Sequence, residues 1–247
     1  MSYLLVIHHD RLWYPGGQLP RSEALDTTAL RQRPIGEWQG QAAYLVTGYE
    51  PPAEELVSIR DFMASDEALF LLAGRARHLA HFEATHQYCG CCGARNHPED
   101  TLGALRCSRC GHTVWPRIAP CVIVAIRRGH QVLLAQHRRH TDNLYTVLAG
   151  FVEPGEAVEM AVMREVREET GLAIHQIRYV ASQPWPFPDS LMLAFIADYQ
   201  EGEIQCDGHE LTAAGWYDAT QLPSIPRRGT IARQLIELAL GQDIPDQ

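Results

Sequence analysis

Three glutamates in the second half of the chain have the residue type and the spacing of metal ligands. Glu165 lies three residues before Glu168 and four before Glu169, so on a helix all three side chains project from roughly one face. Carboxylates crowded in this way repel one another unless a cation lies between them. Oxygen donors in this number suit Mg²⁺ or Mn²⁺, which favour carboxylates together with substrate phosphates. The alternative interpretation is a solvent-exposed acidic helix face without a ligand.

The residues around the glutamates favour the metal site. Gly150 lets the backbone approach a metal closely, and Pro154-Gly155 forms a tight turn before a helix expected from about Val158 to Glu169. Gly171 is a candidate C-cap, and Arg164 can hold a neighbouring carboxylate in place as part of the catalytic set. The full pattern runs as Gly150, five residues, Glu156, seven residues and then Arg164-Glu165-Val166-Arg167-Glu168-Glu169-Thr170-Gly171-Leu172. This pattern is the Nudix box, so this part of the chain resembles the Nudix hydrolases.

The resemblance implies both a fold and a reaction. The expected fold is α+β, an αβα sandwich with a mixed sheet, in which the box forms a loop, a helix and a second loop. The expected reaction is hydrolysis of a nucleoside diphosphate linked to a further group, in which water attacks phosphorus beside divalent ions. The resemblance gives Glu165 and Glu169 as principal metal ligands, Glu168 as an assisting residue, and Glu169 also as the group that helps to deprotonate water. The backbone carbonyl of Ala149 and the side chain of Glu210 complete the Mg²⁺ or Mn²⁺ site.

A proline-rich loop farther along the chain carries two aromatic side chains. It contains three prolines in five residues, which stiffen the backbone and exclude a regular central strand. Trp185 and Phe187 are rigid surfaces suited to stacking on a planar base or a nicotinamide ring. The alternative is that these aromatics fill the edge of a sheet.

The run SQPWPFP at this distance after a Nudix box resembles the NADH pyrophosphatase subfamily, over roughly Arg75 to Leu240 and only weakly over the first ~70 residues. This resemblance implies cleavage of NADH, and less readily NAD, to nicotinamide mononucleotide and AMP. It also implies removal of NAD caps from RNA, as in bacterial members, and a homodimer. Leu102 stands where members have an acidic residue, a departure outside the hydrolytic centre. The implied substrate contacts are Arg60, Trp115, Gln183, Pro184, Trp185, Pro186, Phe187, Pro188, Asp189, Ser190 and Ala232.

Four of the seven cysteines form two pairs, Cys89-x-x-Cys92 and Cys107-x-x-Cys110, with fourteen residues between the pairs. Disulfides are rare in a reducing cytosol, so two such pairs indicate a metal. Four thiolates bind Zn²⁺ tetrahedrally and leave no position for water, which makes a structural zinc ribbon. Iron or a redox pair is the alternative, and Cys91 can in principle replace a ligand of the first pair.

These motifs divide the chain into a small mixed α/β N-terminal domain over residues 1–86, a zinc ribbon over 87–114 and a Nudix hydrolase domain over 115–247. Apolar runs predict strands at 3–7, 42–46, 121–126, 131–136, 145–149, 174–182 and 191–199, and helical periodicity predicts helices at 66–84, 158–169 and 231–240. The predicted apolar stripe of the first helix consists of Ala68, Leu71, Leu72, Ala76 and Leu79.

The overall charge limits the classes of partner. A formal charge of −9 argues against a protein that holds long nucleic acids, because phosphate binding needs concentrated Lys and Arg. The first residues lack the basic start and long apolar run of a secretory signal. No apolar stretch approaches the ~20 residues that a membrane helix needs. We therefore expect a cytoplasmic protein with no membrane partner.

Three functions are compatible with these features. The first is an NAD(H) diphosphatase with catalytic Mg²⁺ or Mn²⁺ and one structural Zn²⁺ in each chain. The second uses the same chemistry with NAD-capped RNA as the main substrate. The third is a zinc-ribbon regulator that binds nucleic acid and carries an inactive Nudix domain, which the intact glutamates and the acidic charge disfavour. The sequence leaves open the main cellular substrate and the preferred divalent ion.

Overall fold

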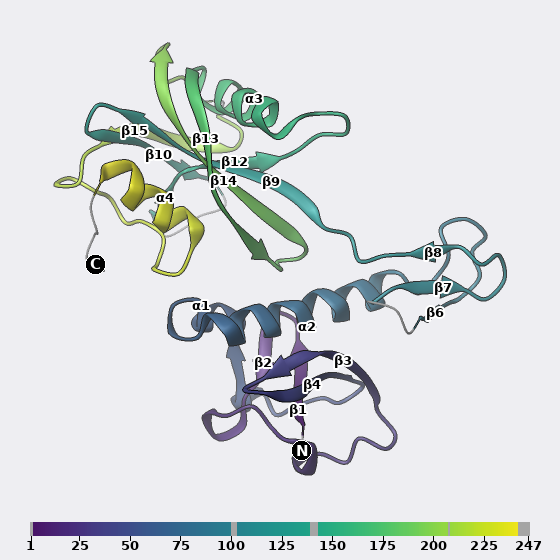
Figure 1. Cartoon of the computed structure of the whole chain (residues 1–247). Coiled ribbons are helices and arrows are strands. Elements are labelled where there is room, and N and C mark those ends of the chain that lie inside the picture. Colours follow the sequence, from purple (N-terminus) through teal and green to yellow (C-terminus); the bar gives the residue numbers. More distant parts are fainter. Residues whose placement is uncertain (1, 100–102, 139–142, 207, 242–247) are drawn as a thin grey trace. The chain divides into compact units, whose positions relative to one another are not determined.

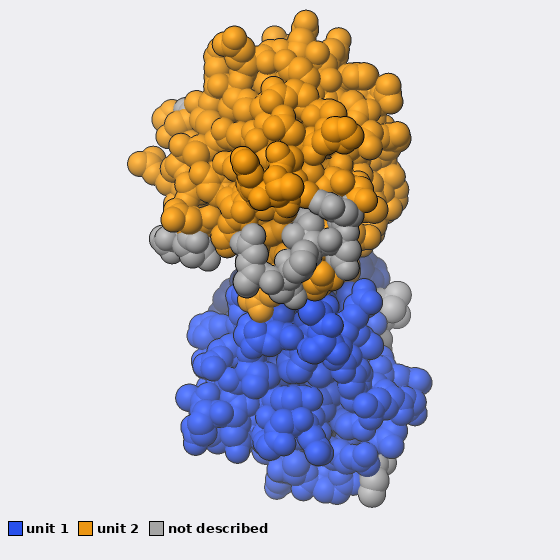
Figure 2. Space-filling model, turned by 90° about the vertical axis from the view of Figure 1, so that its left-hand side faces the viewer, with its two compact units in different colours: residues 1–118, 185–189 blue, residues 119–184, 190–247 orange. Residues whose placement is uncertain are grey.

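The contacts within the chain define two compact units, which Figure 2 shows in two colours. The first unit contains residues 1–118 and 185–189, and the second contains residues 119–184 and 190–247. The finer boundaries after residues 86 and 114 remain a prediction. In this computed structural model, the residues described are 2–99, 103–138, 143–206 and 208–241.

A five-stranded sheet lies at the centre of the first unit, in the order β3-β4-β1-β2-β5. Strand β1 is parallel to β4, whereas the other neighbouring strands are antiparallel. The predicted strands at 3–7 and 42–46 correspond to β1 and β4. The strand bounds are β1 (Tyr3–His8), β2 (Arg11–Trp13), β3 (Arg31–Trp38), β4 (Gln41–Thr47) and β5 (Leu56–Ser58).

Helix α2 (Glu67–Thr85) packs on this sheet after the short helix α1 (Phe62–Ser65) (Figure 1). The Asp66 carboxylate caps α2 by accepting a hydrogen bond from the Leu69 backbone N–H at 3.0 Å. The predicted apolar stripe is wrong at its start, where Ala68 is exposed and Leu71 is 42% exposed. The larger neighbouring side chains face the sheet instead, and the buried residues of α2 are Leu69, Phe70, Leu72, Ala73, Gly74, Ala76, Leu79 and Phe82.

The cysteine segment forms a small three-stranded antiparallel sheet in the order β6-β7-β8. Its strands are short, so the segment contributes few side chains to a hydrophobic core. The bounds are β6 (Asn96–Pro98), β7 (Leu105–Cys107) and β8 (Thr113–Val114).

The second unit contains a seven-stranded mixed sheet and two helices. Its main path is β11-β10-β9-β14-β13, while β12 also pairs with β9 and β15 also pairs with β10. Strands β9 and β14 are parallel, whereas β9 is antiparallel to β10 and β12. The elements are β9 (Ala119–Arg128), β10 (Gln131–His137), β11 (Tyr145–Thr146), β12 (Leu148–Phe151), α3 (Val158–Thr170), β13 (Ala173–Trp185), β14 (Ser190–Glu201), β15 (Leu211–Tyr217) and α4 (Ile231–Leu240).

Alternate residues of β9 belong to two separate hydrophobic cores, as the twofold periodicity of a strand requires. Val122 and Val124 lie in the core that includes Val162 of α3. Ile123, between them, lies in the core that includes Leu235 of α4. The sheet is therefore covered by α3 on one face and by α4 on the other (Figure 1). This arrangement confirms the predicted αβα sandwich.

The observed elements differ from the predicted ones in several places. The predicted strand at 145–149 consists of two strands, β11 and β12, separated at Val147. Strand β13 continues through Pro184 to Trp185, which is possible because β13 lies at the edge of the sheet, where no neighbour needs the missing N–H. The strands that were not predicted are β2, β3, β5, β15 and the three short strands of the cysteine segment. Gly171 adopts the left-handed conformation, with φ of 72°, and ends α3 as predicted.

Within the part of the chain that the structure describes, no helix is both long enough and apolar enough to span a bilayer.

Candidate functional site

Arg164 on α3 lies at the centre of a carboxylate network. Its guanidinium donates to both carboxylate oxygens of Glu156, at 2.8 and 2.9 Å. It also donates to Glu165 at 2.8 Å and to Glu168 at 3.1 Å. A bond of 2.9 Å to the carbonyl oxygen of Phe151 ties the helix to the preceding strand. The hydrogen bonds to the glutamates, that to Glu156 above all, raise the pKa of Arg164. One permanent cation is thus shared by three carboxylates, which leaves negative charge in excess.

Glu165 occupies a position that only glycine leaves open. A Cβ atom at Gly150 would overlap the Glu165 carboxylate, so any other residue there would displace it. The Glu165 side chain is 14% exposed. Burial raises the pKa of Glu165; Arg164 opposes this effect, and the negative charges of Glu168 and Glu210 add to it. A cation at this position would stabilise the ionised carboxylate.

Glu169, Glu210 and His137 form a second group, in which one ligand atom of each residue lies within 4.8 Å of the others. Glu169 is 3% exposed and His137 is 4% exposed, whereas Glu210 is exposed. His137 ends β10, and the pairing of β10 with β15 shifts register between Gln136 and His137. Irregularities of this kind redirect side chains at the ends of strands. Strand β10, helix α3 and the segment before β15 thus each contribute one possible ligand.

The sequence analysis did not single out His137. The available signal was a histidine directly after the predicted strand at 131–136, which contains the apolar run Val132, Leu133, Leu134 and Ala135. Its proximity to Glu210, 73 residues later in the chain (210 − 137), is visible only in the folded structure.

The donor set fits a hard or intermediate divalent cation. Carboxylates suit Mg²⁺ and Mn²⁺, and imidazole is a common ligand of transition metals. The Glu165 carboxylate fills the space beside Gly150. There it is close enough to Glu210 for the two charges to interact. The arrangement can therefore neutralise an anionic substrate through a bound cation despite the acidic surroundings.

Two further residues, Glu168 and Ala149, were predicted for this centre. The Glu168 side chain is 61% exposed and is held by Arg164. Among the described residues, Glu168 does not belong to the group formed with His137. Ala149 lies in β12 opposite Ile123 of β9.

The aromatic residues of the proline-rich loop belong to the first unit and pack partly buried against its hydrophobic core. The Trp185 and Phe187 rings meet edge to face, with centroids 5.2 Å apart. The guanidinium carbon of Arg60 lies 3.6 Å from the centroid of the Phe187 ring and 5.8 Å from that of Trp185. Three predicted substrate residues are thus brought together. Protein atoms already occupy part of the aromatic surface, and both rings remain half-exposed.

In the second unit, Gln183 of β13 contacts the start of α4, where Ala232 lies. The Gln183 amide nitrogen donates to the carbonyl oxygen of Gly229 at 2.8 Å, and its oxygen accepts from the Ile231 N–H at 2.9 Å. Gln183 therefore fixes the start of α4, where Ala232 is half-buried. Ser190 begins β14.

The other predicted substrate residues are spread over different surroundings. Trp115 is 53% exposed in the segment after β8. Pro184 and Pro188 are exposed, whereas Pro186 is buried and Asp189 is half-buried. Leu102 lies outside the described residues.

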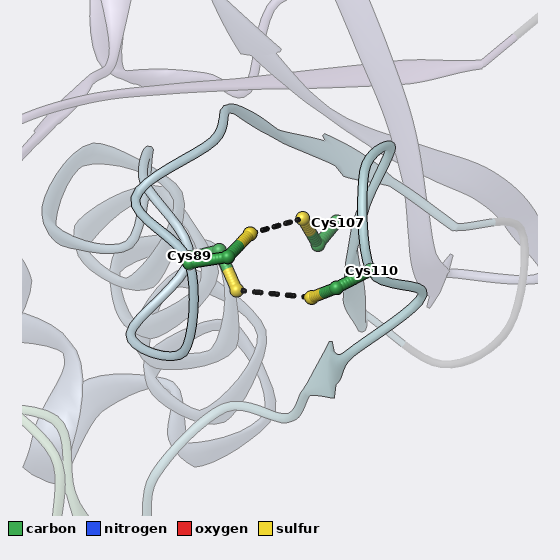
Figure 3. A group of neighbouring side chains, drawn as sticks. Cys89, Cys107 and Cys110 are labelled. Atoms are coloured by element: carbon green, nitrogen blue, oxygen red, sulfur yellow. Dashed lines mark hydrogen bonds between the residues drawn. The ribbon is translucent and has the colours of Figure 1, made fainter.

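The paired cysteines form a cluster in which all four sulfurs lie within 4.8 Å of one another: Cys89, Cys92, Cys107 and Cys110. The sulfurs of Cys89 and Cys110 are 3.7 Å apart and point toward each other (Figure 3). Those of Cys92 and Cys107 are 3.5 Å apart. Hydrogen bonds from the backbone N–H groups of Cys110 and Arg109 lower the pKa of Cys107 to about 6. Cys91 is exposed and outside the cluster. The arrangement can hold one metal ion through four thiolates.

Comparison with known proteins agrees with this geometry. The NUDIX domain family matches residues 116–239. The protein named NAD-capped RNA hydrolase NudC from Erwinia tasmaniensis is 50% identical over 238 residues, which are 96% of this chain and 90% of that protein. The protein of the same name from Escherichia coli (strain SMS-3-5 / SECEC) is also 50% identical, over 96% of this chain and 92% of its own length.

A solved structure shares the fold. The NUDIX hydrolase from Nitrosomonas europaea superposes with a TM-score of 0.53 at 22% identity, covering 64% of this chain and 95% of that one. With the match to the family over half of the chain and the relatives at 50% identity, this protein belongs to the Nudix hydrolases and groups with the NAD-capped RNA hydrolases named NudC.

Proposed function

We propose that this chain hydrolyses the pyrophosphate bond of NADH and NAD to nicotinamide mononucleotide and AMP, and that it removes NAD caps from the 5′ ends of RNA. The observation that carries the proposal is the group of His137, Glu169 and Glu210 beside the Glu165 carboxylate that Arg164 holds. The names of the relatives at 50% identity support the choice of substrate.

Glu165, Glu169 and Glu210 would hold Mg²⁺ or Mn²⁺, together with the carbonyl oxygen of Ala149. When bound, the cation neutralises the pyrophosphate and lowers the pKa of water. Arg164 keeps Glu165 oriented through a 2.8 Å hydrogen bond and remains charged throughout. Glu169 would accept the proton of the attacking water, since a carboxylate placed at the centre can act as general base.

The four-cysteine cluster would hold one structural Zn²⁺ in each chain. A closed site of this kind contributes directly to folding. Elemental analysis of freshly purified protein is expected to give one zinc per chain, and Cys107→Ser is expected to yield an unstable or poorly soluble protein. A zinc-free protein with four free thiols would contradict the assignment.

Recognition of the dinucleotide would involve the loop from Gln183 to Ser190, together with Arg60, Trp115 and Ala232. The half-exposed Trp185 ring, set at 5.2 Å from Phe187, supports stacking on one ring of the substrate. A homodimer and a cytoplasmic location complete the proposal. The homodimer rests on the resemblance to the NADH pyrophosphatase subfamily, and the location rests on the expectation from the sequence.

Product analysis tests the reaction directly. Incubation of the protein with NADH and Mg²⁺ or Mn²⁺ should release reduced nicotinamide mononucleotide and AMP in equal amounts. Adding 5′-NAD RNA as a competitor then decides between the two substrates, because strong inhibition at low RNA concentration would identify the capped RNA as the preferred one. Absence of both products under either metal would overturn the proposal.

A further inference from the structure

Asp10 forms an ion triad in the first unit. Its carboxylate accepts hydrogen bonds from Nε of Arg77 at 2.8 Å and from Nη1 of Arg60 at 3.1 Å. Nη2 of Arg77 makes a second contact with the same carboxylate, at 2.8 Å. Asp10 lies in the turn after β1, Arg60 in the 3₁₀ turn Ile59–Asp61, and Arg77 on α2. Three separate elements of the first unit are thereby fixed to one another.

Both guanidinium groups of the triad also contact the proline-rich loop. Arg77 donates a hydrogen bond to the carbonyl oxygen of Pro188 at 2.9 Å, and its guanidinium carbon lies 5.6 Å from the centroid of Phe187. Arg60 covers the Phe187 ring at 3.6 Å. Cations over an aromatic face are attracted by the quadrupole of the ring. The carboxylate of Asp10 orients both cations toward the loop.

A glycine of α2 leaves room for the loop. A Cβ atom at Gly74 would lie 2.9 Å from Cγ of Pro186, closer than such atoms approach one another. Pro186 is buried, so its ring has little freedom to move away. Gly74 has no positive φ and lies inside a helix, where glycine is less favourable than alanine by roughly 1 kcal/mol. Close packing of the loop accounts for a residue that helix propensity alone disfavours.

From these contacts we infer that Asp10 and Arg77 are positioning residues for substrate recognition, acting through the loop Trp185–Asp189, and that Gly74 provides the surface on which this loop rests. The inference depends on the proposed function for the identity of the substrate. The placement of the loop itself rests on the contacts alone. Arg77 contacts the loop directly, whereas Asp10 acts through Arg77 and Arg60, so that its effect on binding is transmitted by the orientation of Trp185 and Phe187.

Asp10→Asn and Gly74→Ala test the inference by disturbing two different contacts of the loop. Asp10→Asn removes the charge that orients both arginines, while Gly74→Ala favours the helix and displaces Pro186. Asp10→Asn should raise the KM for NADH by about tenfold or more, the size expected when a hydrogen bond to a charged group is lost, with a smaller change in kcat. Gly74→Ala should also raise the KM more than it changes kcat, because the displaced Pro186 moves the loop. Arg75→Gln, at the next and exposed position of α2, is the matched control and should behave as wild type.

A double-mutant cycle separates positioning from general destabilisation. If Asp10 acts through the loop, Asp10→Asn in a Phe187→Ala background should change kcat/KM for NADH by no more than about twofold. Fully additive effects, or an unchanged KM in both single variants, would overturn the inference while leaving the proposed function intact.

Hydrogen exchange in the free protein tests the placement of the loop without any substrate. The peptide spanning residues 184–190 should exchange faster in Asp10→Asn and in Gly74→Ala than in wild type and in Arg75→Gln. Equal exchange in all four proteins would also overturn the inference. A wild-type protein that does not cleave NADH would refute the proposed function and with it the recognition role, whereas the exchange result would still report on the loop.

Discussion

Around Arg164 the carboxylates outnumber the guanidinium groups, whereas around Asp10 the guanidinium groups outnumber the carboxylates. Arg164 is one guanidinium that binds three carboxylates, whereas Asp10 is one carboxylate that binds two guanidinium groups. Burial raises the pKa of Glu165 in the first case. In the second, burial also acts to raise the pKa of Asp10, but the hydrogen bonds and charges of Arg77 and Arg60 together lower it.

The difference separates two tasks. The region around Arg164 retains negative charge that only additional cations can balance, which suits metal-assisted attack on a pyrophosphate. The region around Asp10 has one guanidinium in excess of its carboxylate and presents aromatic side chains, which suits recognition of a planar ring. The following variants test whether the chemistry and the recognition are divided in this way.

The largest effect is expected for Glu169→Gln. This change should lower kcat by on the order of 10²–10⁴, because it removes a metal ligand and the proposed base. The melting temperature should stay close to that of wild type, since the substitution keeps the shape of the side chain. Steady-state kinetics with NADH and a thermal melt provide the measurement. A variant that retains more than about a tenth of the wild-type rate would contradict the assigned role.

The next largest effect is expected for the double change of Trp185 and Phe187 to Ala. Each ring that stacks on substrate should contribute about 5- to 150-fold to kcat/KM, equivalent to roughly 1–3 kcal/mol. NADH and ADP-ribose, which lacks the nicotinamide ring, should be compared side by side with a thermal melt. Selective loss on NADH supports recognition of that ring. Equal losses on both substrates, together with a large drop in melting temperature, would leave the aromatics with a packing role alone.

His137→Gln should affect metal binding more than folding. Residues that ligate or orient the ligands of a metal typically change its affinity by about 10- to 100-fold. Titration of Mn²⁺ into metal-free protein, followed by electron paramagnetic resonance, measures this affinity without turnover. His130→Gln is the matched control, because His130 is exposed in the turn between β9 and β10. Equal affinities in the two variants would remove His137 from the site.

The smallest effect is expected in the pH dependence of stability at Asp10. Because the pKa of Asp10 in the folded protein lies below its ordinary value of 3.8, its ionised form stabilises the fold above that value. This contribution is lost as the pH falls through the lowered pKa. The melting-temperature difference between wild type and Asp10→Asn should thus be constant from about pH 7 to 5 and shrink below about pH 4. A difference that grows on acidification would contradict the ion triad.

Local spacing made part of this site predictable from the sequence. The separation of Glu165 from Glu169 and of Cys89 from Cys92 is fixed by one helical turn or one tight turn, so each group can be recognised before the fold is known. The predicted helices follow from local periodicity, whereas the αβα arrangement was expected from the resemblance to the Nudix hydrolases. The predicted strands deviate at the break of Val147, and β3 and β15 are among the strands that were not predicted.

Contacts between distant parts of the chain could not be predicted in this way. Asp10 and Arg77 are 67 residues apart, and Arg77 and Pro188 are 111 residues apart. Arginines and aspartates at such separations are common, and nothing in their spacing selects a partner. His137 enters the metal group only because β10 ends beside α3 and the segment that carries Glu210. These contacts are set by the tertiary structure and not by local spacing in the sequence.

The division between chemistry and recognition is tested most directly by measuring kcat and KM for NADH in wild type, Glu169→Gln and the Trp185/Phe187 double alanine variant under the same metal. We expect wild type to release reduced nicotinamide mononucleotide and AMP, Glu169→Gln to lose kcat with KM changed by less than about threefold, and the loop variant to raise KM more than it lowers kcat. If the loop variant loses as much kcat as Glu169→Gln with an unchanged KM, the two regions do not divide the tasks as we propose.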